Sequence, residues 1–145
     1  MLQRFMDFII GISVCYKHIQ RIKATEMTEF GLKGSHGIYL FFLHHNPDGL
    51  TASQLSQLCG EDKAATSRGL AVLQEKGYIQ TDEKKYRSNI RLTESGLEIA
   101  QKVDKIAEQW VSFGGDHLTN EERAAFYQSL KIIAESLQKH YDGLS

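Results

Sequence analysis

Small and basic side chains gather between residues 63 and 71, at a spacing that places them on one side of a helix. Leu70 and Leu73, with Ala65 or Thr66 one turn earlier, form the apolar stripe that predicts the buried side. The opposite side then carries Lys63, Ala64, Ser67, Arg68 and Ala71. Small residues let a helix lie deep in a major groove, where a serine and an arginine reach base edges or phosphates. The pattern therefore favours binding of duplex DNA over a merely solvated helix face.

A second group of basic residues lies in a hairpin-like segment further along the chain. Two strand-like runs, Tyr78–Thr81 and Asn89–Leu92, bracket the charged segment Asp82–Arg87. Lysine and arginine side chains in such a hairpin bind phosphates without regard to base sequence. The residues predicted to contact DNA are Thr51, Lys63, Ala64, Ala65, Ser67, Arg68, Lys84, Lys85 and Arg87.

The net charge of the 145-residue chain is −1, which by itself is not typical of a nucleic-acid-binding protein. The distribution of charge favours DNA binding nevertheless. Between Asp62 and Arg91 there are seven basic and four acidic residues, a local net charge of +3. A dimer doubles this basic patch, and local charge rather than total charge sets the affinity for phosphates.

Two short helices are predicted to position these residues. The run Thr51–Gln54 is a capping box that opens the first helix, in which Leu55 and Leu58 are expected to face inward. The second helix is expected over residues 62–76, with Gly77 as the residue after its end. Two short helices, a tight turn and a basic hairpin stand in the order of a winged helix-turn-helix.

Four short motifs in this region resemble the MarR family of bacterial transcriptional regulators. In the order in which the family has them, they are Leu55–Leu58, Lys63–Arg68, Leu73–Ile79 and Ile90–Gly96. The resemblance implies an obligate dimer, a palindromic operator and, usually, repression that is relieved by a small effector or by oxidation. One departure concerns the wing, which is the hairpin-like segment between Tyr78 and Leu92. The family commonly carries an Asp-Arg-Arg-like run there. The matching positions here are Lys84, Lys85 and Tyr86, so phosphate contact is expected and reading of the minor groove is left open.

Long amphipathic helices are predicted at both ends of the chain. The first carries an apolar stripe at helical spacing, made of Leu2, Phe5, Ile9, Ile12, Tyr16, Ile19 and Ile22. Further helices are expected over Ser35–His45, from about Thr93 to Gly114, and after the capping box Thr119–Glu122. The last of these has a stripe expected to face inward, made of Phe126, Leu130, Ile133 and Leu137. Pairing with a second copy is favoured over a helical layer within one subunit, because a small lobe cannot cover all these faces.

The predicted fold is therefore mainly α with a small β-hairpin, a winged helix-turn-helix lobe plus long terminal dimerisation helices. Residues 1–145 are expected to form a single MarR-like domain, with the DNA-binding lobe over 35–92 and the helical dimerisation region over 1–30 and 93–145. Two cysteines, no secretory signature and no apolar run long enough to cross a bilayer indicate a cytoplasmic protein without membrane contact.

The predicted function is a transcriptional regulator, expected to be a repressor that binds a pseudo-palindromic operator as a homodimer and is released by a small effector. The family resemblance implies an aromatic or lipophilic effector, with a pocket made from His18, Arg21, His36, Tyr39 and Trp110. One alternative is a thiol-based redox sensor that uses Cys15, which resembles the first-helix cysteine of the peroxide-sensing branch of the family. Cys15 also fits as a small buried apolar residue. A second alternative is a winged-helix adaptor that binds protein rather than DNA.

Neither a metal site nor a catalytic site is expected. The six histidines show no metal-ligand spacing, and the adjacent His44 and His45 are expected to point about 100° apart on a helix. Zinc sensing occurs in some members of the family, but their ligand pattern is not visible in this sequence. No nucleophile stands beside an oriented base, so the prediction is a non-enzymatic protein without a cofactor.

Overall fold

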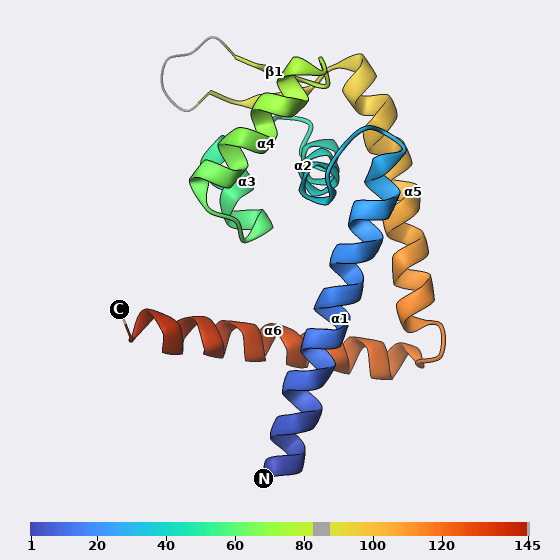
Figure 1. The fold of residues 1–145 in the computed structure, drawn as a ribbon, viewed down its shortest axis with the longest axis vertical. Coiled ribbons are helices and arrows are strands. Elements are labelled where there is room, and N and C mark those ends of the chain that lie inside the picture. Colours follow the sequence, from blue (N-terminus) through green and yellow to red (C-terminus); the bar gives the residue numbers. More distant parts are fainter. Residues whose placement is uncertain (83–87, 145) are drawn as a thin grey trace. The chain divides into compact units, whose positions relative to one another are not determined.

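The structure is a computed structural model that describes residues 1–82 and 88–144 (Figure 1). The described residues form six helices and one two-stranded sheet. In chain order these are α1 (Leu2–Thr28), α2 (Gly34–His44), α3 (Ala52–Cys59), α4 (Lys63–Glu75), β1 (Ile79–Thr81), β2 (Ile90–Leu92), α5 (Glu94–Gly115) and α6 (Asn120–Asp142). This order confirms the predicted mainly helical fold with a small hairpin. The chain divides into two compact units, Met1–Ile106 and Ala107–Ser145, and α5 runs through the boundary between them.

Helix α2 forms the centre of the first unit. It contacts α1, α3, α4 and β2, and its apolar sequence is accordingly buried on several sides. Tyr39, Leu40 and Leu43 of this helix are each at most 2% exposed. The surrounding elements complete the core with Leu55, Leu70, Leu73, Ile79, Ile90, Ala100 and Val103. The core thus lies directly beneath the two short helices that the sequence predicts to read DNA.

The helix ends agree with the predicted capping signals. The hydroxyl of Thr51 accepts a hydrogen bond from the backbone N–H of Gln54, and the hydroxyl of Thr119 accepts one from Glu122, so both capping boxes are confirmed. Gly60 ends α3 with φ of 63°, and Gly77 follows α4 with φ of 73°. Glycine adopts this left-handed conformation without the penalty that a Cβ brings.

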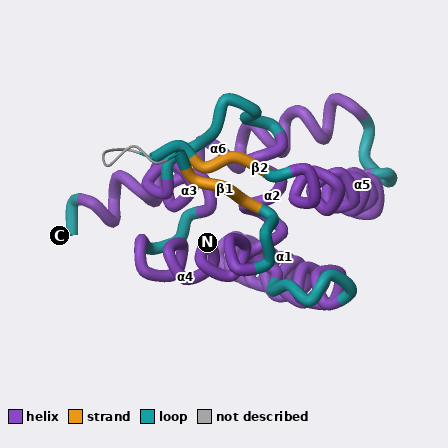
Figure 2. The backbone as a smooth tube through the Cα atoms, turned by 90° about the horizontal axis from the view of Figure 1, so that it is seen from above, coloured by secondary structure: helices purple, strands orange, loops and turns teal. Residues whose placement is uncertain are grey.

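The two strands of the wing pair as the sequence predicts. They are antiparallel, with Ile79 opposite Leu92 and Thr81 opposite Ile90, and Figure 2 shows them in orange side by side. Ile79 and Ile90 are buried, whereas the next residues of the two strands, Gln80 and Arg91, are exposed, because successive side chains of a strand point to opposite faces. A single bridge between Leu50 and Ile90 extends the pairing to the segment before α3.

The apolar stripes of the terminal helices are uncovered in the single chain. All seven predicted stripe residues of α1 are exposed, from 42% at Ile9 to 75% at Leu2. In α6, the four residues expected to face inward are also exposed, from 36% at Ile133 to 56% at Leu137. Helix α6 buries no residue within one chain, so the inward orientation predicted for this stripe is wrong for the isolated subunit. No helix among the described residues is both long and apolar enough to cross a membrane.

The prediction for one core residue of α3 is also wrong. Leu58 was expected to face inward with Leu55, but it is 49% exposed, while Leu55 is fully buried. The buried side of α3 consists of Leu55 and Ser56, since the Ser56 hydroxyl donates to the backbone carbonyl of Glu61 at 2.7 Å. This hydrogen bond fixes the rotation of α3 and leaves Leu58 on the outer side.

Candidate nucleic-acid interface

Helix α4 is held in place by a cap at its start and by a core-facing side along its length. The Asp62 carboxylate accepts a hydrogen bond from the backbone N–H of Ala65 at 2.7 Å, and this contact fixes the first turn. Thr66, Gly69, Leu70 and Leu73 are buried. The predicted stripe is therefore confirmed with Thr66, rather than Ala65, as its first member.

The opposite side of α4 is exposed along its first two turns. Lys63, Ala64, Ser67, Arg68 and Ala71 are all exposed. Ala65 is only half-buried, and its backbone N–H is already used by the Asp62 cap. The exposed side therefore combines short side chains, which permit close approach, with two cations and a hydroxyl. These are the groups that bind phosphates and base edges in a major groove.

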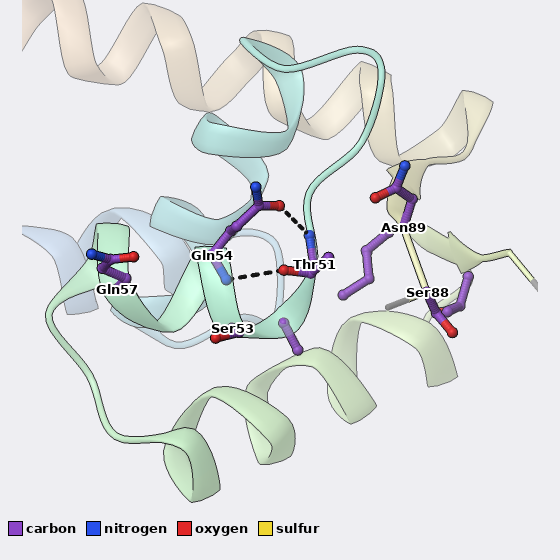
Figure 3. Close-up of a pocket in the computed structure, with 9 residues that line it drawn as sticks. Thr51, Ser53, Gln54, Gln57, Ser88 and Asn89 are labelled. Atoms are coloured by element: carbon purple, nitrogen blue, oxygen red, sulfur yellow. Dashed lines mark hydrogen bonds between the residues drawn. The ribbon is translucent and has the colours of Figure 1, made fainter. Parts of the chain in front are cut away.

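The start of α3 lies beside a hollow that reaches to the wing strands. Figure 3 shows the reciprocal hydrogen bonds of Thr51 and Gln54 at its edge, 3.1 Å and 2.8 Å long. The hollow has a volume of about 640 Å³ and is lined by Thr51, Ala52, Ser53, Gln54, Gln57, Thr81, Ser88, Asn89 and Ile90. None of the lining side chains carries a charge, and most of them end in a hydroxyl or an amide group. The Thr51 hydroxyl accepts the cap hydrogen bond and keeps its own proton, which is suited to donation to a phosphate oxygen.

The base of the wing is fixed by an arginine that the sequence analysis did not single out. The Arg91 Nε–H donates to the backbone carbonyl of Asp48 at 3.2 Å, and an Arg91 Nη lies 4.0 Å from an Asp82 carboxylate oxygen. The first contact joins β2 to the segment before Leu50, and the second joins it to the residue that follows β1. The three predicted wing contacts, Lys84, Lys85 and Arg87, lie outside the described residues.

A tyrosine and a glycine set the position of α4 on the core. The Tyr39 hydroxyl donates to the carboxylate of Glu61, in the turn between α3 and α4. Burial is the main cause that raises the pKa of Tyr39 well above its ordinary value, so the phenol stays a proton donor. A Cβ on Gly69 would overlap the Tyr39 ring, so the glycine permits the close approach of α4 to α2. Sequence reasoning missed both roles, because neither forms a local motif.

The residues proposed to bind an effector differ in their exposure. His36 and Tyr39 are buried in the core, at 4% and 1% exposure, whereas His18 and Arg21 are exposed on α1. Burial is the largest cause that lowers the pKa of His36, and its Nδ1 accepts a hydrogen bond from the backbone N–H of Lys33. Trp110 belongs to the second unit. Within the first unit, a hollow of about 450 Å³ is lined instead by Tyr16, Gln20, Lys23, Ala24, Gly34, Ser35, Ile38, Cys59, Gly60 and Glu61.

The two cysteines differ in their surroundings. Cys15 is exposed on α1 in the single chain, so its placement does not follow the prediction of a small buried residue. Cys59 is half-buried at the end of α3, and burial raises the pKa of its thiol to about 11. Cys15 is therefore the more accessible of the two sulfurs for oxidation.

The sequence and the fold of the chain are similar to those of known transcriptional regulators. A family model described as the MarR family matches residues 30–87. No curated protein matches the chain in sequence. Among solved structures, a MarR transcriptional regulator from Methanosarcina mazei is 25% identical, with a TM-score of 0.78 over 92% of this chain and 91% of that one.

Two further structures are more distant in sequence and equally close in fold. A MarR protein from Peptoclostridium difficile is 18% identical, with a TM-score of 0.84 over 96% of this chain and 92% of that one. The Staphylococcus aureus MepR–DNA complex is 21% identical, with a TM-score of 0.81 over 91% of this chain and 97% of that one. The resemblance to the MarR family of transcriptional regulators is therefore confirmed, by sequence for residues 30–87 and by fold for nearly the whole chain.

Proposed function

We propose that this protein is a transcriptional regulator that binds duplex DNA with α4 in the major groove. The observation that carries the proposal is the exposed side of α4. It presents Lys63, Ser67 and Arg68 among small residues, while the other side of the same helix is fixed on the core. A rigid helix that projects small and basic side chains is the arrangement with which helix-turn-helix proteins read base edges. The similarity in fold to MepR in its DNA complex supports this assignment.

The proposed active form is a homodimer that binds a pseudo-palindromic operator. Residues 35–92 form the DNA-binding lobe in this proposal, and residues 1–30 and 93–145 form the dimerisation region. The exposed stripes of α1 and α6 support it, because soluble monomers rarely leave apolar surfaces of this extent in water. A two-fold axis would then place the two copies of α4 about one DNA turn, roughly 34 Å, apart.

In this proposal, the protein represses transcription in the cytoplasm, and the binding of a small effector relieves the repression. The hollow beside α1, α2 and the end of α3 supports an effector site in the first unit, since it is concave and contains the cationic Lys23. Desolvation lowers the pKa of that lysine, while the Glu61 carboxylate opposes the shift. A second candidate is redox control through Cys15, which its exposure favours over a purely structural role. Neither candidate requires a catalytic step.

A gel-shift titration against the promoter region of the protein's own gene tests the proposal. The substitution Arg68→Ala should weaken binding by about 1–3 kcal/mol, which corresponds to roughly 5- to 150-fold. Arg4→Ala, which removes an exposed arginine at the start of α1, is the matched control and should leave affinity unchanged. The triple substitution of Lys84, Lys85 and Arg87 to alanine should weaken all DNA sequences alike. It should also reduce the slope of log affinity against log salt by up to about 0.9 for each phosphate that the wing no longer neutralises.

Two results would count against the assignment. No shift by the parent protein with any fragment of this promoter, at low salt and micromolar concentration, would favour the adaptor alternative. Equal affinities of the parent and Arg68→Ala proteins would show that α4 does not carry the contact.

A further inference from the structure

Two histidines and an aspartate converge where the end of α2 meets α5, within the first unit. The Nδ1 atom of His44 lies 2.8 Å from the Oδ2 atom of Asp104, and the Nε2 atom of His45 lies 3.1 Å from the same oxygen. Each of the three side chains offers one ligand atom, and these atoms all lie within 4.8 Å of one another. The cluster is remote in sequence from α4, and the proposed contact with DNA does not use it.

The convergence corrects the expectation that adjacent histidines diverge. That expectation considers only the Cβ directions, which point about 100° apart for successive residues of a helix. His44 is the last residue of α2 and His45 is its C-cap, whose backbone N–H still donates to the carbonyl of Phe41 at 3.1 Å. The helical path therefore continues as far as His45, and the two rings nevertheless reach the same carboxylate, with their centroids 5.2 Å apart. The ring of Phe41 lies 4.5 Å from the His45 ring and limits its movement.

We propose that His44, His45 and Asp104 bind a divalent first-row transition-metal ion of the Zn²⁺ type. Two imidazole nitrogens and a carboxylate oxygen form a ligand set that such ions prefer to hard cations. Metal–ligand bonds of about 2.0–2.2 Å at tetrahedral or octahedral angles separate the ligand atoms by roughly 3 Å. The two nitrogen–oxygen distances, 2.8 Å and 3.1 Å, match this separation within a few tenths of an ångström.

Three further features favour a cation at this place. The second carboxylate oxygen of Asp104 is buried and has no hydrogen-bond partner among the described residues, so its negative charge is compensated only in part. The end of α2 directs its last carbonyl groups toward this region, and the C-terminal end of a helix attracts positive charge. The side chain of His45 is 53% exposed, which gives an ion access and leaves room for water as a further ligand. A bound ion would join α2, the central helix of the core, to α5.

Titration of the full-length protein with Co²⁺ and Zn²⁺ after removal of metals tests the proposal. We expect one ion per chain, visible absorption bands of bound Co²⁺, and displacement of Co²⁺ by Zn²⁺ but not by Mg²⁺ or Ca²⁺. His45→Gln removes an imidazole ligand and Asp104→Asn removes the negative charge of the carboxylate, so each should weaken binding at least about 100-fold. A Zn²⁺ concentration 100-fold above the Kd should raise the Tm of the parent protein by about 5 °C or more, and should leave the Tm of His45→Gln unchanged.

The matched control is His117→Gln, which removes an exposed histidine of the second unit and should keep parental binding. His45→Gln alters a half-exposed side chain, so this variant stays folded and remains informative if Asp104→Asn is unstable. Binding weaker than about 100 μM in the parent, or parental affinity in both variants, would overturn the site and leave a hydrogen-bonded cluster without metal. Equal loss of binding in His117→Gln would overturn it too, because adventitious coordination by surface histidines would then explain the signal.

Discussion

Substitution of Gly69 by alanine should destabilise the protein, although the same change stabilises most helices. Gly69 lies within α4 on its buried side, and a Cβ there would overlap the Tyr39 ring. In a helix interior, alanine is favoured over glycine by about 1 kcal/mol. Overpacking of a tight core costs about 1–3 kcal/mol. The Tyr39 ring is 1% exposed and its hydroxyl is bound to Glu61, so the ring has little freedom to move away.

Because the ring has little freedom to move, the overpacking cost should lie in the upper part of its range, at about 2–3 kcal/mol. After subtraction of the gain from alanine, the expected net loss is about 1–2 kcal/mol, with a decrease in Tm of about 5 °C for a chain of this size. Urea and thermal unfolding of the parent and the variant measure this loss. The matched control is Gly11→Ala in α1, where nothing lies within 4 Å of an added Cβ. Gly11 lies about 200° around the helix from Ile9, away from the apolar stripe. This control should gain up to about 1 kcal/mol.

The double variant Gly69→Ala, Tyr39→Leu separates steric overlap from other causes. Leucine occupies less space than tyrosine, so the alanine should cost less in this background than in the parent. If Gly69→Ala proved as stabilising as Gly11→Ala, the close packing of α4 on Tyr39 would not be what requires glycine at this position.

Three further predictions concern assembly, pH and thiol chemistry. Replacing Ile133 and Leu137 with aspartate should abolish operator binding without any change in α4. The Tm of the parent protein should rise with protein concentration. A well-folded monomer, seen by sedimentation at micromolar concentration, would contradict the dimer. Because burial lowers the pKa of His36 in the folded state, the unfolded chain binds the proton more readily, so stability should fall as the pH decreases below 6.5. His36→Gln should flatten the pH dependence of the urea midpoint between pH 7 and pH 5, and an unchanged slope would assign that dependence to other groups. Cys59, whose pKa is about 11, should react with iodoacetamide at pH 7.5 far more slowly than the exposed Cys15. Mass spectrometry measures the labelling, and equal labelling of the two cysteines would contradict the burial of Cys59.

Local signals allowed much of the lobe that contains α3, α4 and the wing strands to be predicted from the sequence. The caps at Thr51, Asp62 and Thr119 and the glycine after α4 each act within a few residues, so the sequence contains the whole interaction. The side of α4 that carries Ser67 and Arg68 followed from helical periodicity in the same way. These features depend on spacing rather than on distant parts of the chain.

The features that sequence reasoning missed depend on contacts between residues that are distant in the sequence. His36 and Tyr39 have side chains suited to a polar pocket, and only the packing around α2 shows that both are buried. The role of Gly69 depends on Tyr39, thirty positions earlier. His44 and His45 reach one carboxylate on α5, that of Asp104, and the spacing of the two histidines in the sequence does not show this contact.

The bridge between Leu50 and Ile90 has a consequence for how the lobe folds and opens. The backbone N–H of Leu50 donates to the carbonyl of Ile90, and the N–H of Ile90 donates to the carbonyl of Leu50, so the two hydrogen bonds close a loop of chain. Within that loop lie α3, α4 and β1. Closing a loop of this length costs about 3 kcal/mol of chain entropy, which the packing inside the loop must offset before the bridge is stable. The helices should therefore form and collapse first, and the bridge should close last. In the native state, its rupture should release the amide protons of α3, α4 and β1 to exchange as one cooperative unit.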